Sequence, residues 1–312
     1  MIGASGRTGA ELCRALHAAG LPFRPVARDL SRWRACGIPV SGRPGDLTQP
    51  EGLARAVAGA TAIVNCAHAR HTPALLAAAP PAAKLILLGS TRRHSRWRDA
   101  HGDGVRAGEA AFLGSDRRGV MLHPTMIYGA TGEDNVQRLA ALLRHLPVAP
   151  LPGGGRALVQ PIHQADLTRC ILAALAREWD AARALVVAGP APLPYRDFTA
   201  AVARAAGLRP PPVVPLPGAL LRALAPLARL LPGLPRIRGD EIRRLLEDKA
   251  FDVGPMRREL GVTGMPLERG LALTFGASPL ASPPAPPHTA AEHPAEAPTC
   301  PSSTELPNSI PR

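Results

Sequence analysis

Short runs of aliphatic and β-branched residues alternate along the chain with longer segments in which apolar residues recur every three or four positions. The short runs predict strands at Phe23–Ala27, Ala62–Cys66, Lys84–Gly89, Val120–His123 and Leu185–Ala188. The longer segments predict helices at Thr8–Ala19, Pro50–Ala58, Pro73–Ala79, Ala107–Leu113, Asn135–Leu146 and Gln164–Arg177. This alternation is typical of βα units around a parallel sheet. We therefore expect an α/β fold with a Rossmann-like, doubly wound parallel sheet.

The region after the last strand has a different pattern. Prolines separate three further helical segments, at Tyr195–Ala206, Gly218–Leu231 and Gly239–Glu247. We expect a Rossmann-like domain over residues 1–190 and a small cap over 191–275. Within the first domain, Thr72 is placed to cap the third helix, with Pro73 at its first helical position.

Residues 276–312 form a third, compositionally distinct part. Ten of these 37 residues are proline, and apolar periodicity is almost absent. Such a segment cannot bury enough apolar surface to offset the entropy lost on ordering, so we expect a disordered tail.

Composition and charge exclude several classes of protein. The chain has 37 Lys and Arg residues against 24 Asp and Glu, but only Lys84 and Lys249 are lysine. The arginines are scattered and only 3% of residues are aromatic, which argues against a nucleic-acid partner. Five cysteines without a CxxC pair indicate neither a disulfide framework nor a zinc cage, and we expect no metal.

The same residues bear on location. Free cysteines suit a reducing compartment. We also find neither a secretory signal nor an uninterrupted apolar run of about 18 residues, so we expect a cytoplasmic protein.

The chain begins with a glycine loop that runs directly into the first predicted helix. Gly3, Gly6 and Gly9 have the GxxGxxG spacing, with Ser5, Arg7 and Thr8 between them. Glycines permit a tight turn and close approach of a pyrophosphate, whose charge is stabilised by the free N–H groups at a helix N-terminus. The loop therefore predicts a dinucleotide site, with a merely flexible N-terminus as the alternative.

Only Met1 and Ile2 precede the loop, although a buried central strand of about five residues is expected there. Either the strand begins upstream of the given sequence or it is a stub. We favour a truncated first strand, because its loss would leave backbone groups of the neighbouring strands unpaired.

The second predicted strand ends at Arg28, where NAD-binding proteins usually carry an acidic residue for the ribose 2′-hydroxyl. An arginine pairs there with a 2′-phosphate, and Arg7 offers a second guanidinium. We therefore expect NADP rather than NAD, with a solvated arginine as the alternative.

Several short motifs, taken together, resemble one superfamily. They are Gly3–Gly9, Gly45–Leu47, Ile63–Ala67, Leu88–Thr91, His123–Gly129 and Pro161–Leu167. In order and spacing the chain resembles the extended and atypical short-chain dehydrogenases/reductases, of the NAD-dependent epimerase/dehydratase and NmrA-like kind. It is also similar to the reductase-like accessory subunit of respiratory complex I.

The resemblance implies roles for residues outside the glycine loop. Asp46 and Leu47 flank the adenine, and Asn65, Cys66 and Ala67 line the cofactor. Ser90 takes the place of the active-site serine or threonine, and the segment from Pro124 borders the nicotinamide and the substrate.

The catalytic Tyr-x-x-x-Lys of the superfamily is missing. Only Tyr128 and Tyr195 exist, and neither is followed by lysine four residues later. Aligning Glu109 with the glutamate that usually follows this motif puts Val105 at the lysine position and His101 at the tyrosine position. His101 is thus a candidate acid/base, with a solvated loop histidine as the alternative.

Two other segments are candidates for binding. The arginines of Thr91–Arg106 follow a strand's carboxyl end and suit a phosphate-bearing substrate, unless this segment is a solvated loop. Residues 217–232 are apolar with a basic face, which suits either peripheral membrane contact or packing within the domain.

Two functions follow. The first is an NAD(P)-dependent oxidoreductase or nucleoside-diphosphate-sugar epimerase that transfers protons through a group near Ser90 or His101. The second is a non-catalytic dinucleotide-binding regulator, redox sensor or accessory subunit.

Overall fold

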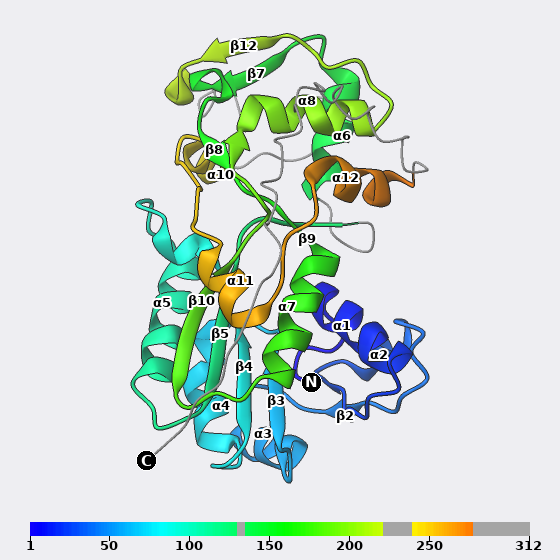
Figure 1. Cartoon of the computed structure of the whole chain (residues 1–312), viewed down its shortest axis with the longest axis vertical. Coiled ribbons are helices and arrows are strands. Elements are labelled where there is room, and N and C mark those ends of the chain that lie inside the picture. Colours follow the sequence, from blue (N-terminus) through cyan, green and yellow to red (C-terminus); the bar gives the residue numbers. More distant parts are fainter. Residues whose placement is uncertain (130–134, 221–238, 277–312) are drawn as a thin grey trace, which may run out of the picture. The chain divides into compact units, whose positions relative to one another are not determined.

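A parallel sheet forms the base of the computed structural model, which describes residues 1–129, 135–220 and 239–276. Its four-stranded part has the order β10-β5-β4-β3, and a β1–β2 pair lies beyond β3. The strands are β1 (Val26–Ala27), β2 (Arg43–Pro44), β3 (Ala62–Asn65), β4 (Lys84–Leu88), β5 (Gly119–Pro124) and β10 (Ala182–Val187). The expected Rossmann-like α/β fold is confirmed (Figure 1).

Ile2 joins the two parts of the sheet. It forms parallel bridges to Val26 of β1 and Asn65 of β3, and its N–H donates to the Val64 carbonyl at 2.8 Å. The Cys66 N–H donates back to the Ile2 carbonyl at 3.0 Å. The chain proceeds from Ile2 to β1 and β2 on one side and to β3, β4, β5 and β10 on the other. Ile2 is therefore the topological switch point, where doubly wound sheets bind their ligands.

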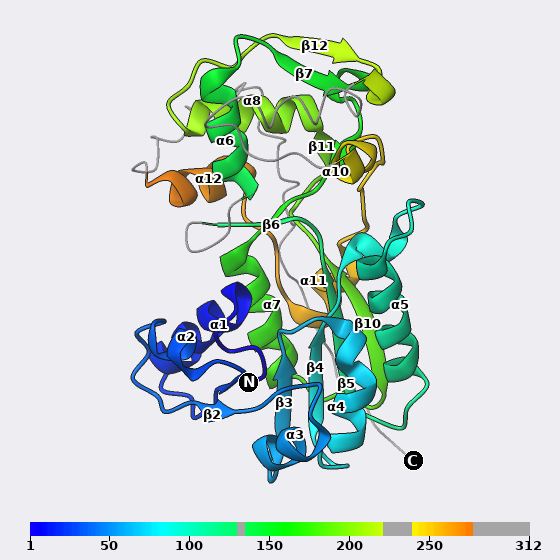
Figure 2. The same ribbon diagram turned by 180° about the vertical axis from the view of Figure 1, so that it is seen from behind.

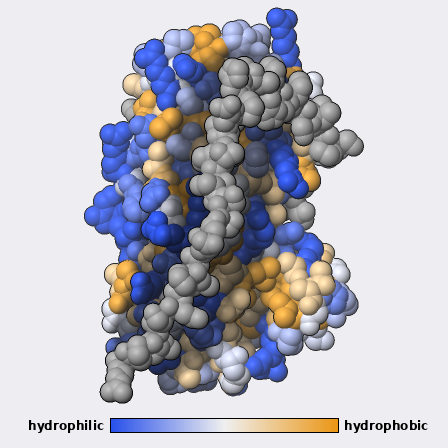
Figure 3. All heavy atoms as spheres, viewed as in Figure 1, coloured by the Kyte–Doolittle hydropathy of each residue, from blue (hydrophilic) through white to orange (hydrophobic). Residues whose placement is uncertain are grey.

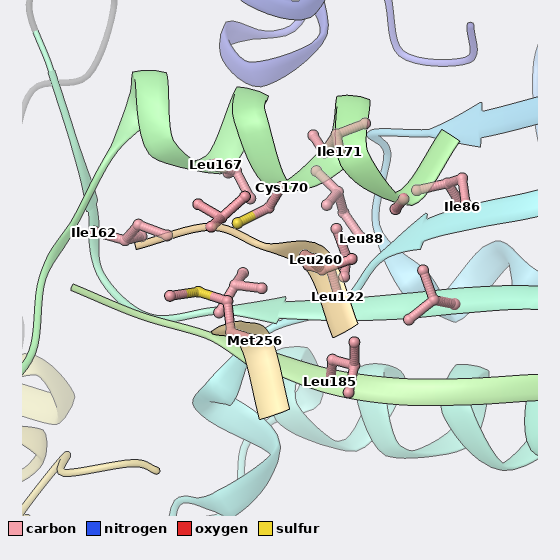
Figure 4. Packing of buried hydrophobic residues seen from close by; sticks show 14 of the residues in the cluster. Ile86, Leu88, Leu122, Ile162, Leu167, Cys170, Ile171, Leu185, Met256 and Leu260 are labelled. Atoms are coloured by element: carbon pink, nitrogen blue, oxygen red, sulfur yellow. The ribbon is translucent and has the colours of Figure 1, made fainter. Parts of the chain in front are cut away.

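Alternation along the strands explains why both faces are covered. Ile86 and Leu88 of β4 point into one apolar cluster, whereas Leu85 and Leu87 point into another. The first cluster packs against α1 (Arg7–Ala18), α7 (Gln164–Ala176) and α11 (Gly254–Leu260). Figure 4 shows the side chains that α7 and α11 contribute to it. The second packs against α3 (Pro50–Val57), α4 (Thr72–Ala78) and α5 (Ala100–Leu113), on the side seen in Figure 2.

Smaller elements build the cap. Its helices are α6 (Asn135–His145), α8 (Tyr195–Ala205), α10 (Gly239–Arg244) and α12 (Leu267–Phe275). Its strands are β6 (Ile127–Tyr128), β7 (Ala149–Pro152), β8 (Leu158–Val159), β9 (Ile162–His163), β11 (Leu193–Pro194) and β12 (Val213–Leu216). They pair as β12–β7, β11–β8 and β6–β9, and α6 and α8 pack around a cluster that includes Val136 and Phe198.

Three short elements connect the sheet to its helices: α2 (Leu30–Arg34), η1 (Ala69–His71) and η2 (Thr91–His94). Two details differ from the sequence expectations. Thr72 does not cap α4, because it lies inside the helix and its hydroxyl donates to the Ala69 carbonyl at 2.7 Å. α5 begins at Ala100, seven residues earlier than expected, so much of the segment Thr91–Arg106 is helical.

Other expectations concern parts that lie outside the described residues. These are the disordered tail, apart from Gly276, and the segment 217–232 beyond Leu220. Within the described ranges, no helix has the length and apolarity needed to cross a membrane.

Candidate functional site

The glycine loop packs too closely for side chains. Gly3 has a φ of +73°, and a Cβ on Gly9 would lie 2.1 Å from the Gly3 carbonyl oxygen. Gly6 is the N-cap of α1, with no side-chain cap and no acidic residue in the first turn. Among the intervening residues, Ser5 and Thr8 are half-buried and Arg7 is exposed. The loop thus presents an uncapped helix N-terminus, which favours an anionic group.

The end of β1 presents a cation rather than a carboxylate. Arg28 is exposed, whereas Asp29 is the N-cap of α2. The Asp29 Oδ1 accepts from the Ser31 N–H at 2.8 Å, the Ser31 hydroxyl at 2.6 Å and the Arg32 N–H at 3.2 Å. These hydrogen bonds, the Ser31 hydroxyl first, lower the pKa of Asp29. Asp29 therefore caps α2, and Arg28 is the charged side chain that remains beside the expected ribose position.

Asp46 belongs to the same corner. Its Oδ1 accepts from the Thr48 N–H and hydroxyl, both at 2.8 Å, and these bonds lower the pKa of Asp46. The charges of Arg28 and His71 contribute in the same direction, so both groups lie near it. Leu47 is buried beside it.

The end of β3 reaches the glycine loop. The Asn65 Oδ1 accepts from the Ala67 N–H at 3.0 Å, while the buried Asn65 Nδ2 has no hydrogen-bond partner. A Cβ on Gly3 would lie 3.1 Å from the Ala67 nitrogen. Burial raises the pKa of the Cys66 thiol to about 12, which makes it unreactive. The residues expected to line a cofactor thus meet at this edge of the sheet.

Ser90 follows β4 and is held by a buried polar group. Its N–H donates to the His123 Nδ1 at 3.1 Å, and its hydroxyl accepts from the Arg92 N–H at 3.2 Å. The other nitrogen of His123 lies 3.4 Å from the Glu109 Oε2, which also pairs with Arg93. Pro124 ends β5, and its carbonyl accepts from the Thr91 hydroxyl at 3.1 Å. Glu109 thus anchors the strand end that presents Ser90.

His101 lies in the first turn of α5, not in a loop, and has a partner that the sequence did not reveal. The His68 Nε2 lies 3.1 Å from the His101 Nδ1. The Arg70 N–H donates to the His68 Nδ1 at 3.0 Å, so in the neutral ring the proton of His68 is on Nε2. His68 then donates to His101, whose own proton is on Nε2. His101 is therefore oriented as a hydrogen-bond donor.

Burial keeps this pair neutral. It lowers the pKa of His68 to about 4, with a smaller contribution from His101, and it also lowers the pKa of His101. In the unfolded chain a histidine has a pKa of about 6.5. Between these values the unfolded chain binds more protons than the folded one, so this contribution to stability is lost as the pH falls from 6.5 toward 4.

We expect the thermal midpoint to fall on acidification through this window. Replacing both His68 and His101 with glutamine should reduce that fall by roughly 2 °C, because these histidines no longer titrate. Melting curves between pH 7 and pH 4 measure it, with His17→Gln, an exposed position in α1, as the control. An unchanged pH dependence in the double variant would contradict the neutral pair.

A cavity of about 1170 Å³ opens beyond Ser90. It extends from Ser90, Thr91 and Thr125 at the sheet to β7 and β12 of the cap. Arg92 and Arg96, two of the expected anion-binding arginines, line it, but His101 does not. The candidate acid/base therefore lies beside the cavity rather than in its wall.

Two polar residues of the motif Pro161–Leu167 have structural roles. His163 caps α7, because its Nδ1 accepts from the Ala165 N–H at 3.2 Å. Asp166 accepts from the Met265 N–H at 2.7 Å and pairs with Arg169. In the described part of the chain, no group of three or more His, Cys, Asp or Glu residues is arranged to hold a metal ion.

Comparison with known proteins gives one matching family model and many solved structures of the same fold. Residues 3–93 match the model of a family described as NAD(P)H-binding. No curated protein matches the sequence.

Solved structures share the architecture at low identity. A nucleoside-diphosphate-sugar epimerase from Pseudomonas aeruginosa is 19% identical, with a TM-score of 0.64 over 88% of this chain and 95% of that one. An NADPH-dependent quinone oxidoreductase from Escherichia coli, solved with NADPH, is 15% identical, with a TM-score of 0.66 over 87% and 97%. UDP-glucose 4-epimerase from Thermotoga maritima, solved with UDP-glucose, is 14% identical, with a TM-score of 0.64 over 88% and 96%. Such identities show a common fold.

Proposed function

We propose that this chain, which has the fold of extended short-chain dehydrogenases/reductases and an NAD(P)H-binding domain at residues 3–93, binds NADPH at its glycine loop. The observation that carries the proposal is the uncapped N-terminus of α1 at the switch point of the sheet. In this proposal the pyrophosphate lies at the first turn of α1, which has no side-chain cap and no acidic side chain of its own.

The preference for NADPH over NADH rests on Arg28. An exposed guanidinium follows β1, and the adjacent carboxylate of Asp29 is committed to α2. A 2′-phosphate gains a charge-assisted hydrogen bond from this arginine, whereas a ribose hydroxyl gains little. Titration calorimetry with both nucleotides tests this preference.

We further propose that turnover, a reduction by NADPH, uses His101 in place of the missing tyrosine. NADPH, when bound, supplies the hydride for a carbonyl carbon. Because His101 does not line the cavity, this role places the carbonyl group outside the lined part, next to the His68–His101 pair. There the neutral imidazole of His101, oriented by His68, donates a hydrogen bond from Nε2 to the carbonyl oxygen as charge develops on it. A neutral imidazole is too weak an acid to lose that proton, so solvent protonates the oxygen.

His101→Ala should lower the rate of NADPH oxidation with a responsive carbonyl compound about a hundredfold or more, the loss typical of one oxyanion donor. The affinity for NADPH should remain unchanged. NADPH absorbance with a panel of aldehydes, ketones and quinones measures the rate, and the exposed His17→Ala is the control. Equal rates of NADPH oxidation in the His101→Ala variant and the wild type would exclude this role.

A non-catalytic dinucleotide-binding protein is the second candidate. Val105, which is buried, stands where the superfamily has its lysine, and the chain contains no Tyr-x-x-x-Lys. NADPH binding without oxidation by any member of the panel would favour this regulator or accessory role.

A further inference from the structure

The cavity beyond Ser90 changes character along its length. Helix α6 begins beside β6, the strand that follows β5 of the sheet after two residues, because the Asn135 Nδ2 donates to the Ile127 carbonyl at 2.9 Å. It lines the cavity with Arg138 in its first turns, then with Leu139, Leu142 and Leu143. In Figure 2, α6 leads from the level of β6 toward β7. One helix therefore presents a cation near the sheet and leucines in the cap.

Apolar side chains form most of the wall in the cap. Those outside α6 include the aliphatic Leu146, Leu151, Val159, Leu216 and Ile242 and the aromatic Phe198. This wall suits an apolar group that is excluded from water.

Three polar side chains along this wall, those of Thr125, Thr199 and Gln160, are engaged in hydrogen bonds within the protein. The Thr125 hydroxyl donates to the Gln160 carbonyl and the Thr199 hydroxyl to the Tyr195 carbonyl. The Gln160 side-chain amide donates to the Gly189 carbonyl at 2.9 Å and accepts from the Phe251 N–H at 2.8 Å. A sugar or a base placed here would lose hydrogen bonds to water and find few in return.

The sheet end is cationic. Arg92, Arg96, Arg138, Arg244 and Lys249 line the cavity, together with the carboxylates of Glu247 and Asp248. Asp99, which is not a lining residue, pairs with Arg92 and, at 3.4 Å, with Arg244. Glu247 is itself held by the Ser95 hydroxyl at 2.8 Å and the Arg96 N–H at 3.0 Å, while the Arg96 Nε lies 3.7 Å away with its side chain 69% exposed. Guanidinium groups gathered in this way suit an anionic group next to Ser90.

We propose that the cavity binds an amphiphile with an anionic headgroup and an unbranched aliphatic chain, not a nucleotide sugar. The headgroup lies among the arginines near Ser90 and the chain extends along α6 toward β7. As a substrate class this inference rests on the proposed function, because the ligand would then lie beside the nicotinamide, but binding is measurable without turnover.

Titration calorimetry of the full chain with decyl phosphate, below its micellar concentration, tests the proposal. UDP-glucose, decanol and inorganic phosphate are the comparison ligands. Decyl phosphate should bind at least about tenfold more tightly than the other three, because only it satisfies both ends of the cavity. UDP-glucose binding as tight as that of decyl phosphate would overturn the proposal.

Two variants in the cavity wall, each with a control variant elsewhere, test where the ligand binds. Leu142→Gln, in the cavity wall, should weaken decyl phosphate binding about fivefold or more, whereas Leu113→Gln, an exposed leucine of α5, should not. Arg96→Gln should weaken it by about tenfold and the exposed Arg118→Gln should not. Equal affinity in the cavity variants and their controls would also overturn the proposal.

NADPH affinity, measured on the same preparations, separates the two proposals. Loss of NADPH binding with decyl phosphate binding retained would refute the dinucleotide site alone. The reverse result would refute the amphiphile site alone.

Discussion

Gly9→Ala should weaken NADPH binding by about a hundredfold or more. The new methyl group would lie 2.1 Å from the Gly3 carbonyl oxygen and 3.1 Å from the Ala4 Cα. Both are backbone atoms, so the loop itself must move, and with it the N–H groups that face the pyrophosphate. Titration calorimetry measures the loss of binding.

The sign of the stability change provides a control. Alanine is normally favoured over glycine inside a helix by about 1 kcal/mol, yet Gly9→Ala should lower the thermal midpoint because of the clash. Gly52→Ala in α3 is the matched variant, since its Cβ would meet nothing closer than 3.8 Å. That variant should be as stable as the wild type or more so and should bind NADPH normally. Normal binding by the Gly9 variant would argue against the loop as the pyrophosphate site.

Arg28→Ala should weaken NADPH binding by about 10- to 100-fold and leave NADH binding unchanged. The loss corresponds to charge-assisted hydrogen bonds between a guanidinium and a 2′-phosphate, which NADH lacks. The loss should diminish at high salt, because Arg28 is exposed and its charge is screened.

Arg34→Gln is the control for total charge, because Arg34 is exposed in the last turn of α2. It should alter neither affinity appreciably. An equal loss for NADPH and NADH in the Arg28 variant would show that Arg28 does not read the 2′-phosphate.

Much of the sheet could be predicted because its strands are short aliphatic runs buried on both faces. The expected strand Lys84–Gly89 corresponds to β4, Lys84–Leu88, and Ala62–Cys66 corresponds to β3. The cap strands escaped prediction because they have only two to four residues, and proline occurs in three of them, as in β7, whose sequence is Ala-Pro-Leu-Pro. Their order is imposed by pairing with distant segments such as β12.

The start of α5 was missed for a specific reason. Its first half contains Gly102 and Gly104, which lower helix propensity and resemble a loop. Close packing explains the glycines of this helix, because a Cβ on Gly108 would lie 2.0 Å from the Ala69 carbonyl oxygen. Packing against η1 thus stabilises a helix that the local sequence alone does not predict.

The site divides in the same way. The glycine loop and Arg28 could be identified from spacing, because each lies where a strand meets a helix. The partner of His101 could not, because His68 lies 33 residues away in the sequence and only the packing of α5 on η1 brings them together. The link from Ser90 through His123 to Glu109 likewise depends on tertiary structure. The sequence could not show that Arg92 and Arg96 line a cavity, because much of the cavity wall comes from distant segments of the cap.

We propose that the glycine loop binds a dinucleotide and that Arg28 selects NADPH. The most direct test of this proposal is titration calorimetry of the full chain with NADPH and NADH under identical salt and pH. We predict micromolar or tighter binding of NADPH and at least about tenfold weaker binding of NADH. Binding of neither nucleotide, or tighter binding of NADH, would contradict the account.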